Sequence, residues 1–330
     1  MEELGAAVIG LRMGYAHAQA YLKNPRTRLV ALCDTDAEQL KKVAEELKVE
    51  TAVTDFKELV GRADIQIVSV ATPDFYHADH SVPFLRAGKN VLCEKPMTLN
   101  LKDALAIIEA ADKSKAKFMV GQVSRFAPGF VRTRELINAG EIGELFYVES
   151  EYAHSYENAR GVGDWRVDAR RHAVIGGGCH AVDLLRWIVG HPQRVYAESN
   201  HKNLLDWPAD DTTVALYHFP NNVLGRLFCS MGVTRPYTMR SCFYGTKGTI
   251  ISDNTSGAIS IFRKGDQKWS EIPVETASHN VEFEIEMFVK HILEGTPVEM
   301  DAREGARTVA ACLGAVTSSR SGKPEMIPNF

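Results

Sequence analysis

The sequence has no run of about 18 consecutive apolar residues, no excess of basic charge and no closely paired cysteines. Without such an apolar run, we expect no membrane span. The 330 residues carry a formal net charge of −4, which argues against nucleic acid as a main partner, because phosphate binding needs a concentrated basic surface. The first ten residues are acidic and enter a strand-like segment at once, so we also expect no signal peptide.

The cysteines are widely scattered along the chain: Cys33, Cys93, Cys179, Cys229, Cys242 and Cys312. This distribution is typical of reduced thiols in the cytoplasm and argues against a disulfide framework. His77 and His80 have an H-x-x-H spacing, and Cys179 adjoins His180. No further ligand completes a tetrahedral set around either pair, so we expect no bound metal.

The chain is longer than one hydrophobic core usually supports, which predicts two domains. In its first third, short apolar runs alternate with amphipathic helical patterns. This alternation is typical of a parallel sheet buried on both faces, and right-handed crossovers make it a doubly wound, Rossmann-type α/β sheet. Its ligand is expected at the carboxyl ends of the strands. The apolar runs are 5–10, 28–34, 65–73, 90–96 and 117–122.

A loop with two glycines, Gly10 and Gly14, follows the first apolar run. A dinucleotide site needs glycines here, because the backbone must turn tightly and approach a pyrophosphate at a helix N-terminus. The loop is not an intact GxGxxG, because Arg12 stands near the place of the second glycine and the loop is one residue short. Alone, it is consistent with a dinucleotide-binding turn or with a plain strand-to-helix turn.

Asp34 ends the second apolar run, 24 residues after Gly10. That is about the spacing of the acid that hydrogen-bonds the adenosine ribose in dinucleotide sites. A carboxylate at this point accepts from both ribose hydroxyls and repels a 2′-phosphate, which favours NAD over NADP. NADP stays possible, because Arg12 is near enough in sequence to meet a 2′-phosphate. The alternative role for Asp34 is the N-cap of the following helix.

Four short motifs, in this order and spacing, resemble the Gfo/Idh/MocA family of glucose–fructose oxidoreductase and inositol dehydrogenase. They are Ala71-Thr72-Pro73 with His77, then Glu94-Lys95-Pro96, then residues 140–149, then residues 180–190. The resemblance covers the whole chain. It implies a dinucleotide-binding Rossmann domain, here residues 1–123, followed by an α+β substrate and oligomerisation domain, residues 124–330, with NAD(P) between them.

The resemblance also implies a set of cofactor-binding residues: Gly10, Arg12, Met13, Gly14, Asp34, Ala71, Thr72, Pro73, His77, Glu94 and Lys95. The composition after residue 145 supports the second domain independently. Alternating, β-branched and aromatic runs separated by turn signals predict the strands of one open, mostly antiparallel sheet. We expect the last helix, about residues 302–320, to pack back toward the first domain. The resemblance also implies that the chain assembles into a homodimer or homotetramer.

Lys95 lies at the end of a predicted strand, where its ammonium can hold a substrate hydroxyl and stabilise a developing alkoxide. Pro96 stiffens the backbone there, which argues against an ordinary surface lysine. The resemblance implies a cis Lys95–Pro96 bond. We expect Glu94 to orient the lysine.

An H-x-x-D-x-x-R-W pattern of the family matches His180, Asp183, Arg186 and Trp187. The resemblance implies that His180 is the general acid/base, a role that needs a group titrating near neutral pH. The alternative is a helix residue that packs under the sheet. Asp183 lies one helical turn from His180 and either orients the imidazole or anchors the helix. The glycines at 176–178 suggest that substrate and nicotinamide approach the backbone there.

One departure from the family concerns the aspartate that many members place four residues before the histidine, since this chain has Gly176 there. Asp168 or His172 is a candidate for the missing polar group. The loop around them also holds Trp165 and Arg166, which suit a sugar or an anionic sugar derivative, although a solvated loop with surface salt bridges is an equal alternative. Gln122 and Arg125, at the domain junction, are further candidates to line the cleft.

The sequence therefore predicts an NAD(P)-dependent oxidoreductase that transfers hydride between nicotinamide and a hydroxyl or keto group of a carbohydrate or polyol. Two alternatives keep the same fold. One is NAD-dependent glycoside cleavage through transient oxidation of the sugar, and the other is a non-catalytic dinucleotide-binding regulator. Retention of both Lys95 and His180 argues against the regulator.

Overall fold

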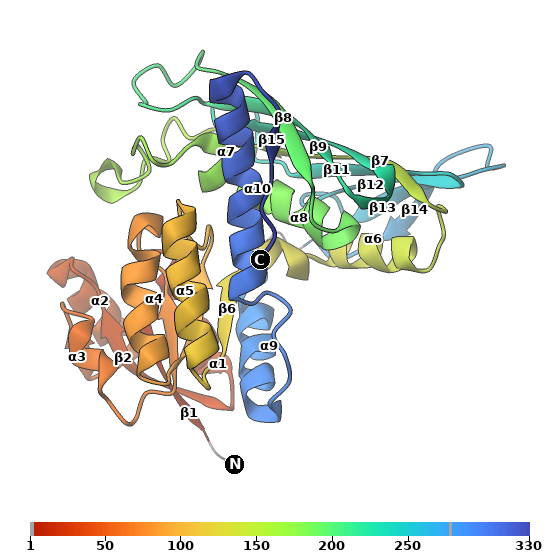
Figure 1. Ribbon diagram of the computed structural model, residues 1–330. Coiled ribbons are helices and arrows are strands. Elements are labelled where there is room, and N and C mark those ends of the chain that lie inside the picture. Colours follow the sequence, from red (N-terminus) through yellow and green to blue (C-terminus); the bar gives the residue numbers. More distant parts are fainter. Residues whose placement is uncertain (1–2, 277–278) are drawn as a thin grey trace. The chain divides into compact units, whose positions relative to one another are not determined.

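The computed structural model describes residues 3–276 and 279–330 (Figure 1). The chain forms two compact units, Met1–Gln122 with Val281–Ala306, and Val123–Asn280 with Arg307–Phe330. The segment Val281–Ala306 therefore belongs to the first unit, although it lies in the range that the sequence assigns to the second domain. Over the described residues, no helix combines the length and the apolar character needed to cross a membrane.

The first unit is built on a six-stranded parallel sheet with the strand order β3-β2-β1-β4-β5-β6. This is the Rossmann order, and it confirms the predicted doubly wound sheet. Its central strands are continuous apolar runs because helices cover both faces. The strands are β1 (Leu4–Ile9), β2 (Thr27–Cys33), β3 (Thr51–Val53), β4 (Ile67–Val70), β5 (Asn90–Glu94) and β6 (Phe118–Gly121).

The helices of this unit follow the sequence patterns, apart from a short one between β3 and β4. Their bounds are α1 (Gly14–Lys23), α2 (Ala37–Leu47), α3 (Lys57–Val60), α4 (His77–Arg86), α5 (Leu101–Lys113) and α9 (Val281–Glu294). Side chains fix two of the N-termini. Asp36 accepts from the Gln39 N–H at the start of α2, and Asn100 accepts from the Asp103 N–H at the start of α5.

The strand register brings the predicted cofactor residues to one edge of this sheet. Ile9 pairs with both Cys33 and Val70, and Val70 pairs with Cys93. The residues that follow these partners in the sequence therefore lie side by side at the carboxyl edge of the sheet. They are Gly10, Asp34, Ala71 and Glu94.

The second unit is built on a nine-stranded sheet with the order β14-β13-β12-β11-β7-β10-β9-β8-β15. Among the described strands of this sheet, β7 and β10 are the only neighbours that pair in parallel, which confirms the mostly antiparallel sheet. The strands are β7 (Leu145–Ala153), β8 (Arg194–Asn200), β9 (Thr212–His218), β10 (Leu224–Ser230), β11 (Arg240–Gly245), β12 (Gly248–Asp253), β13 (Ala258–Arg263), β14 (Ser270–Pro273) and β15 (Glu325–Met326).

Buried and exposed residues alternate along β8 and β9, so one face of this sheet covers a core. The helices of this unit are α6 (Pro128–Asn138), α7 (Ala173–Gly176), α8 (Cys179–Val189) and most of α10 (Ala302–Ser321). The α10 helix packs on the buried face, where Ser318 accepts from the Ala197 N–H and Tyr217 donates to the Ala311 carbonyl.

Candidate active site

The loop after β1 needs both of its glycines for steric reasons. Gly10 has a φ of +85°, and a Cβ atom there would lie 2.6 Å from the Ala71 carbonyl oxygen. A Cβ atom on Gly14 would lie 2.6 Å from Cγ1 of Val8. The N-cap residue of α1, Met13, makes no side-chain cap hydrogen bond, as suits a helix N-terminus that receives a pyrophosphate. The close contacts of the loop with β1 and with the residue after β4 thus require glycine at both positions.

Asp34 hydrogen-bonds this loop rather than capping a helix. Its Oδ2 accepts from the Leu11 N–H at 2.7 Å, and its Oδ1 accepts from the Asp36 N–H at 2.9 Å. Asp36 is the N-cap of α2, so the N-cap alternative for Asp34 is wrong. A carboxylate has about four acceptor sites, which leaves Asp34 with capacity for ribose hydroxyls. The glycine loop and Asp34 therefore fit the adenosine half of a dinucleotide. The guanidinium of Arg12 lies 3.4 Å from Asp36, and both side chains are exposed.

Lys95 follows β5, and its peptide bond with Pro96 is cis, as the resemblance implies. Its backbone N–H donates to Oε2 of Glu94 at 3.1 Å. The other oxygen, Oε1, lies 3.1 Å from Nε2 of His17, and His17 Nδ1 lies 3.1 Å from the Ser69 hydroxyl. Burial raises the pKa of Glu94, but the hydrogen bond and charge of His17 outweigh burial and lower it. The Glu94 carboxylate thus supports the main chain of Lys95 from inside the unit.

His77 joins the loop after β4 to the loop after β5. Its Nδ1 lies 2.9 Å from the Pro96 carbonyl oxygen, and its Nε2 lies 2.9 Å from the Thr72 carbonyl oxygen. Both acceptors are carbonyls, so both contacts are hydrogen bonds only when both nitrogens carry a proton. Burial lowers the pKa of His77, but the Cys93 sulfur, the Asp74 charge and the Pro96 carbonyl outweigh burial and raise it to about 9. The Ala71-Thr72-Pro73 segment is thereby held beside Lys95-Pro96.

A buried acid that the sequence analysis missed lies near Glu94. Glu284 of α9 is fully buried, and neither of its carboxylate oxygens has a hydrogen-bond partner in the described part of the chain. Oε1 lies 3.5 Å from the position that a Cβ atom on Gly121 would take, at the end of β6. Burial and the charge of Glu94 raise the pKa of Glu284 well above its ordinary value. In the sequence, the only indication that Glu284 is buried is its place among the apolar positions of the helical pattern 281–295.

His180 is the second residue of α8 in the second unit and is 2% exposed. Its Nδ1 lies 3.1 Å from the Ser124 hydroxyl in the short helical turn Val123–Phe126. The Tyr152 ring stacks on the imidazole, with centroids 6.0 Å apart and planes at 18°. The sequence analysis missed both neighbours. Ser124 lies in the same segment as Gln122 and Arg125, which the sequence suggested as cleft residues. Its only sequence signal was a polar side chain in a buried segment.

The three glycines before His180 have a packing role that the sequence did not indicate, because side chains of this unit fill the space beside them. A Cβ atom on Gly176 would lie 2.7 Å from Cζ of Arg171, and one on Gly178 would lie 2.8 Å from Sγ of Cys229. A Cβ atom on Gly177 would overlap the Tyr152 ring. The glycines are therefore required so that these protein side chains can pack against the backbone. At the place of the family aspartate, the Arg171 guanidinium lies against the backbone and donates to the Gly176 carbonyl at 3.0 Å.

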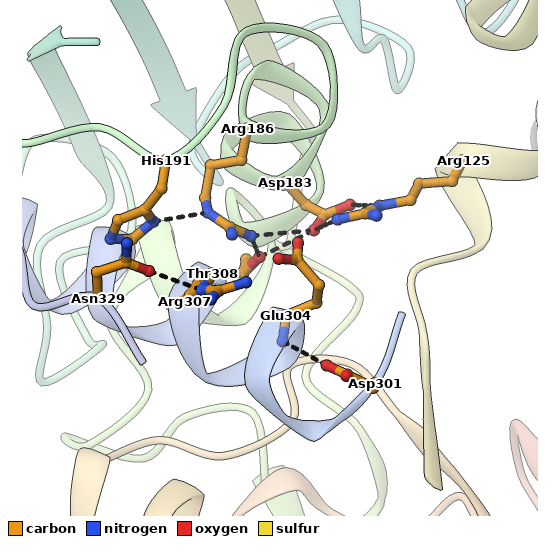
Figure 2. Close-up of polar contacts among 9 residues, drawn as sticks. All are labelled: Arg125, Asp183, Arg186, His191, Asp301, Glu304, Arg307, Thr308 and Asn329. Carbon is orange, nitrogen blue, oxygen red and sulfur yellow. Dashed lines mark hydrogen bonds and ion pairs between the residues drawn. The ribbon is translucent and has the colours of Figure 1, made fainter. Parts of the chain in front are cut away.

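Asp183 is bound by Arg125 through two hydrogen bonds, Nε to Oδ2 at 2.7 Å and Nη2 to Oδ1 at 2.8 Å (Figure 2). Both side chains are buried. The Thr308 hydroxyl donates to Oδ1 of Asp183 at 2.8 Å and accepts from Nη1 of Arg186 at 2.6 Å. This network ties α8 to the turn before α6 and to α10. It favours the helix-anchoring role for Asp183 over the orienting role.

The loop before α7 contains internal ion pairs and cation–π contacts. Asp168 binds Arg170 through both oxygens, and the Arg170 hydrogen bond lowers the pKa of Asp168. The Cζ atom of the Arg166 guanidinium lies 4.4 Å from the centroid of the Trp165 ring.

His172, the N-cap of α7, accepts from the Val174 N–H at 3.4 Å, and its Nε2 lies 3.5 Å from Asp210. Burial lowers the pKa of His172, although Asp210 opposes the shift. Gln122, at the end of the first unit's main segment, is also buried.

Among the described residues, no group of three or more His, Cys, Asp or Glu is placed to hold a metal ion. The six cysteines all lie within the described ranges, are all buried and form no disulfide.

The first unit combines a Rossmann sheet, a glycine loop and a carboxylate after β2, and these features are typical of a dinucleotide-binding domain. Family models agree. Residues 4–122 match the oxidoreductase family with an NAD-binding Rossmann fold, and residues 130–251 match the GFO/IDH/MocA C-terminal domain. The chain belongs to the GFO/IDH/MocA oxidoreductase family, which confirms the resemblance, the enzyme class and the NAD cofactor.

Two curated relatives are similar over most of their length. The inositol 2-dehydrogenase of Rhizobium meliloti is 28% identical over 93% of this chain and 94% of its own. The myo-inositol 2-dehydrogenase of Thermotoga maritima is 26% identical over 90% of this chain and 91% of its own. Among solved structures, an oxidoreductase domain protein from Kribbella flavida is similar with a TM-score of 0.91 at 26% identity, over the full length of both chains.

Proposed function

We propose that this oxidoreductase interconverts a hydroxyl and a keto group on a polyol or sugar, with NAD as the cofactor and Lys95 and His180 as the catalytic residues. The observation that carries the proposal is the position of Lys95. It leaves the carboxyl end of β5 at the same sheet edge as Gly10, Asp34 and Ala71, the edge at which dinucleotides bind in this fold. Similarity to two inositol 2-dehydrogenases supports a cyclic polyol as the substrate class.

Each catalytic residue has a separate task in this proposal. When bound, NAD supplies the acceptor for the hydrogen and the electron pair that leave the alcohol carbon. The Lys95 ammonium binds the reacting oxygen and stabilises the negative charge that develops on it. His180 accepts the hydroxyl proton during oxidation and returns it during reduction. Glu94 and His77 hold the main chain around Lys95, and Asp183 holds the helix that carries His180.

The proposal includes a homodimer or homotetramer in the cytoplasm. The nine-stranded sheet exposes several large apolar side chains: Phe146, Tyr196, Val214, Leu216 and Leu224. Tyr196 and Leu216 are cross-strand partners, so the apolar surface is continuous there and suits a protein interface. Six buried thiols without a disulfide suit a reducing compartment. Sedimentation of the wild type and of Leu216→Glu tests the assembly, and a monomer in both would contradict it.

The experiment for the reaction follows absorbance in the reduced-nicotinamide band with purified protein, NAD or NADP, and a panel of inositols, sugars and sugar acids. We expect NADH formation with at least one cyclic polyol or sugar. Product release from a glycoside without net NADH would contradict the proposal and indicate transient oxidation instead. NAD binding without any turnover across the panel would also count against it.

A further inference from the structure

Ser124 lies between the imidazole of His180 and the thioether of Met239. Its Oγ is 3.1 Å from Nδ1 of His180 and 3.8 Å from Sδ of Met239. All three residues belong to the second unit, and all three are buried, with exposed fractions of 4%, 2% and 0% for Ser124, His180 and Met239. Water therefore has little access to the serine hydroxyl, and its hydrogen bonds are those that the protein offers.

These three groups differ in what they can donate. A serine hydroxyl carries one hydrogen and two lone pairs, whereas a thioether sulfur only accepts. Both contacts are hydrogen bonds at the same time in one arrangement only. In that arrangement the hydroxyl donates to Sδ of Met239 and accepts from a hydrogen on Nδ1 of His180. If the hydroxyl instead donated to Nδ1, nothing would remain to bond the sulfur.

We infer that Ser124 and Met239 together hold neutral His180 in the tautomer that is protonated on Nδ1. This inference assigns positioning roles to both residues, and its use in catalysis rests on the function proposed above. In this tautomer the lone pair lies on Nε2. During oxidation the substrate O–H bond breaks, an N–H bond forms at Nε2, and the ring gains one positive charge. The Nδ1–H to Ser124 hydrogen bond is present before and after this step, so the ring need not turn.

The packing around the imidazole keeps its orientation constant. The Tyr152 ring lies at 18° to the imidazole plane, and Gly177 provides the space for that ring. Met239 belongs to a core cluster with Ala127, Phe130 and Leu184, which fixes its side chain. The sulfur is therefore a stationary acceptor for the Ser124 hydroxyl.

The test reads the tautomer directly. The full chain is labelled with 15N-histidine, and long-range proton–nitrogen spectra are recorded at alkaline pH without substrate. His180 is assigned by the signals that disappear in His180→Gln. We expect Nδ1 of His180 in the wild type to be the protonated nitrogen. In Met239→Leu, which preserves volume, the ratio of the Nδ1–H to the Nε2–H form should fall about fivefold, the size of one net hydrogen bond.

Two further variants sharpen the result. Ser124→Ala should lower the ratio in the same direction. Ser150→Ala, which removes a buried serine whose hydroxyl lies 2.9 Å from that of Ser241, is the matched control and should leave the ratio unchanged. A wild type that is protonated mainly on Nε2 would overturn the inference. So would an unchanged ratio in Met239→Leu in a protein that melts at the wild-type temperature.

The activity is measured separately on the same variants. With a substrate in hand, Met239→Leu should lower kcat and leave KM nearly unchanged, because the residue acts on the base and not on binding. A wild type with the expected tautomer but no turnover on any polyol or sugar would count against the proposed function and not against the tautomer.

Discussion

The ring of Tyr152 occupies the space that a Cβ atom on Gly177 would fill, and the same ring lies nearly parallel to the imidazole of His180. Glycine, tyrosine and histidine thus form one packed stack at the start of α8. Gly177 has a φ of −127°, which any L residue adopts, so the ring alone makes glycine necessary here.

Gly177→Ala is expected to displace the Tyr152 ring and to lower the free energy of unfolding by about 1–3 kcal/mol, as overpacking of a core usually does. Turnover should fall as well, because the ring supports His180. Urea denaturation and steady-state kinetics measure the two effects. The matched control is Gly61→Ala, since Gly61 has a φ of −85° and nothing within 4 Å of its Cβ position. Equal effects of the two substitutions would contradict this account.

Asp183→Ala is expected to cost about 3–5 kcal/mol of unfolding free energy, because it removes the buried counter-charge of Arg125. The comparison is Glu135→Ala, which breaks an exposed Arg132–Glu135 pair at 2.8 Å and should cost less than about 1 kcal/mol. Urea denaturation of both variants provides the test. If Asp183→Ala were as mild as Glu135→Ala, the anchoring role of Asp183 would be wrong.

Much of the fold could be predicted because its signals are local. Apolar runs locate the central strands, and the spacing from Gly10 predicts Asp34 as the ribose carboxylate. Among the elements that were missed, β3 with three residues and β15 with two contain too few residues for a periodicity.

The missed site residues depend on contacts between distant parts of the chain. The partners of the three glycines come from β7, β10 and the loop before α7, and a sequence of glycines carries no information about them. The role of Ser124 depends on its contact with His180, which is 56 residues away in the sequence. Glu284 looks like an ordinary helix acid until the packing of α9 in the first unit shows that it is buried.

Glu284→Gln is expected to stabilise the protein increasingly as the pH rises from about 5 to about 8. The pKa of Glu284 is raised in the folded state, so its contribution to stability is fully present below the unfolded-state pKa and is lost as the pH rises toward the folded-state value. Glutamine does not titrate, so the variant escapes this loss, which reaches at most about 1.4 kcal/mol per pH unit.

Melting temperatures at several pH values test this prediction. Glu286→Gln, on the exposed side of the same helix, is the control and should follow the wild type at each pH. A constant difference between Glu284→Gln and the wild type across the range would show that Glu284 is ionised in the folded protein.

Asp34→Ser is expected to weaken NAD binding and to reduce the preference for NAD over NADP by roughly tenfold or more, because it removes a charged acceptor for the ribose hydroxyls and the repulsion of a 2′-phosphate. Calorimetric titration with each cofactor gives the ratio without any substrate. Asp36→Ser is the control, since serine still caps α2. A cofactor ratio that stays at the wild-type value in Asp34→Ser would refute the ribose assignment.

The most direct test of the central claim compares the turnover of wild type, Lys95→Ala and His180→Ala with an active polyol or sugar, alongside NAD affinity measured by calorimetry. The account predicts that each substitution lowers kcat by at least about a hundredfold, while the NAD affinity of His180→Ala stays close to that of the wild type. Wild-type turnover in both variants would contradict the account.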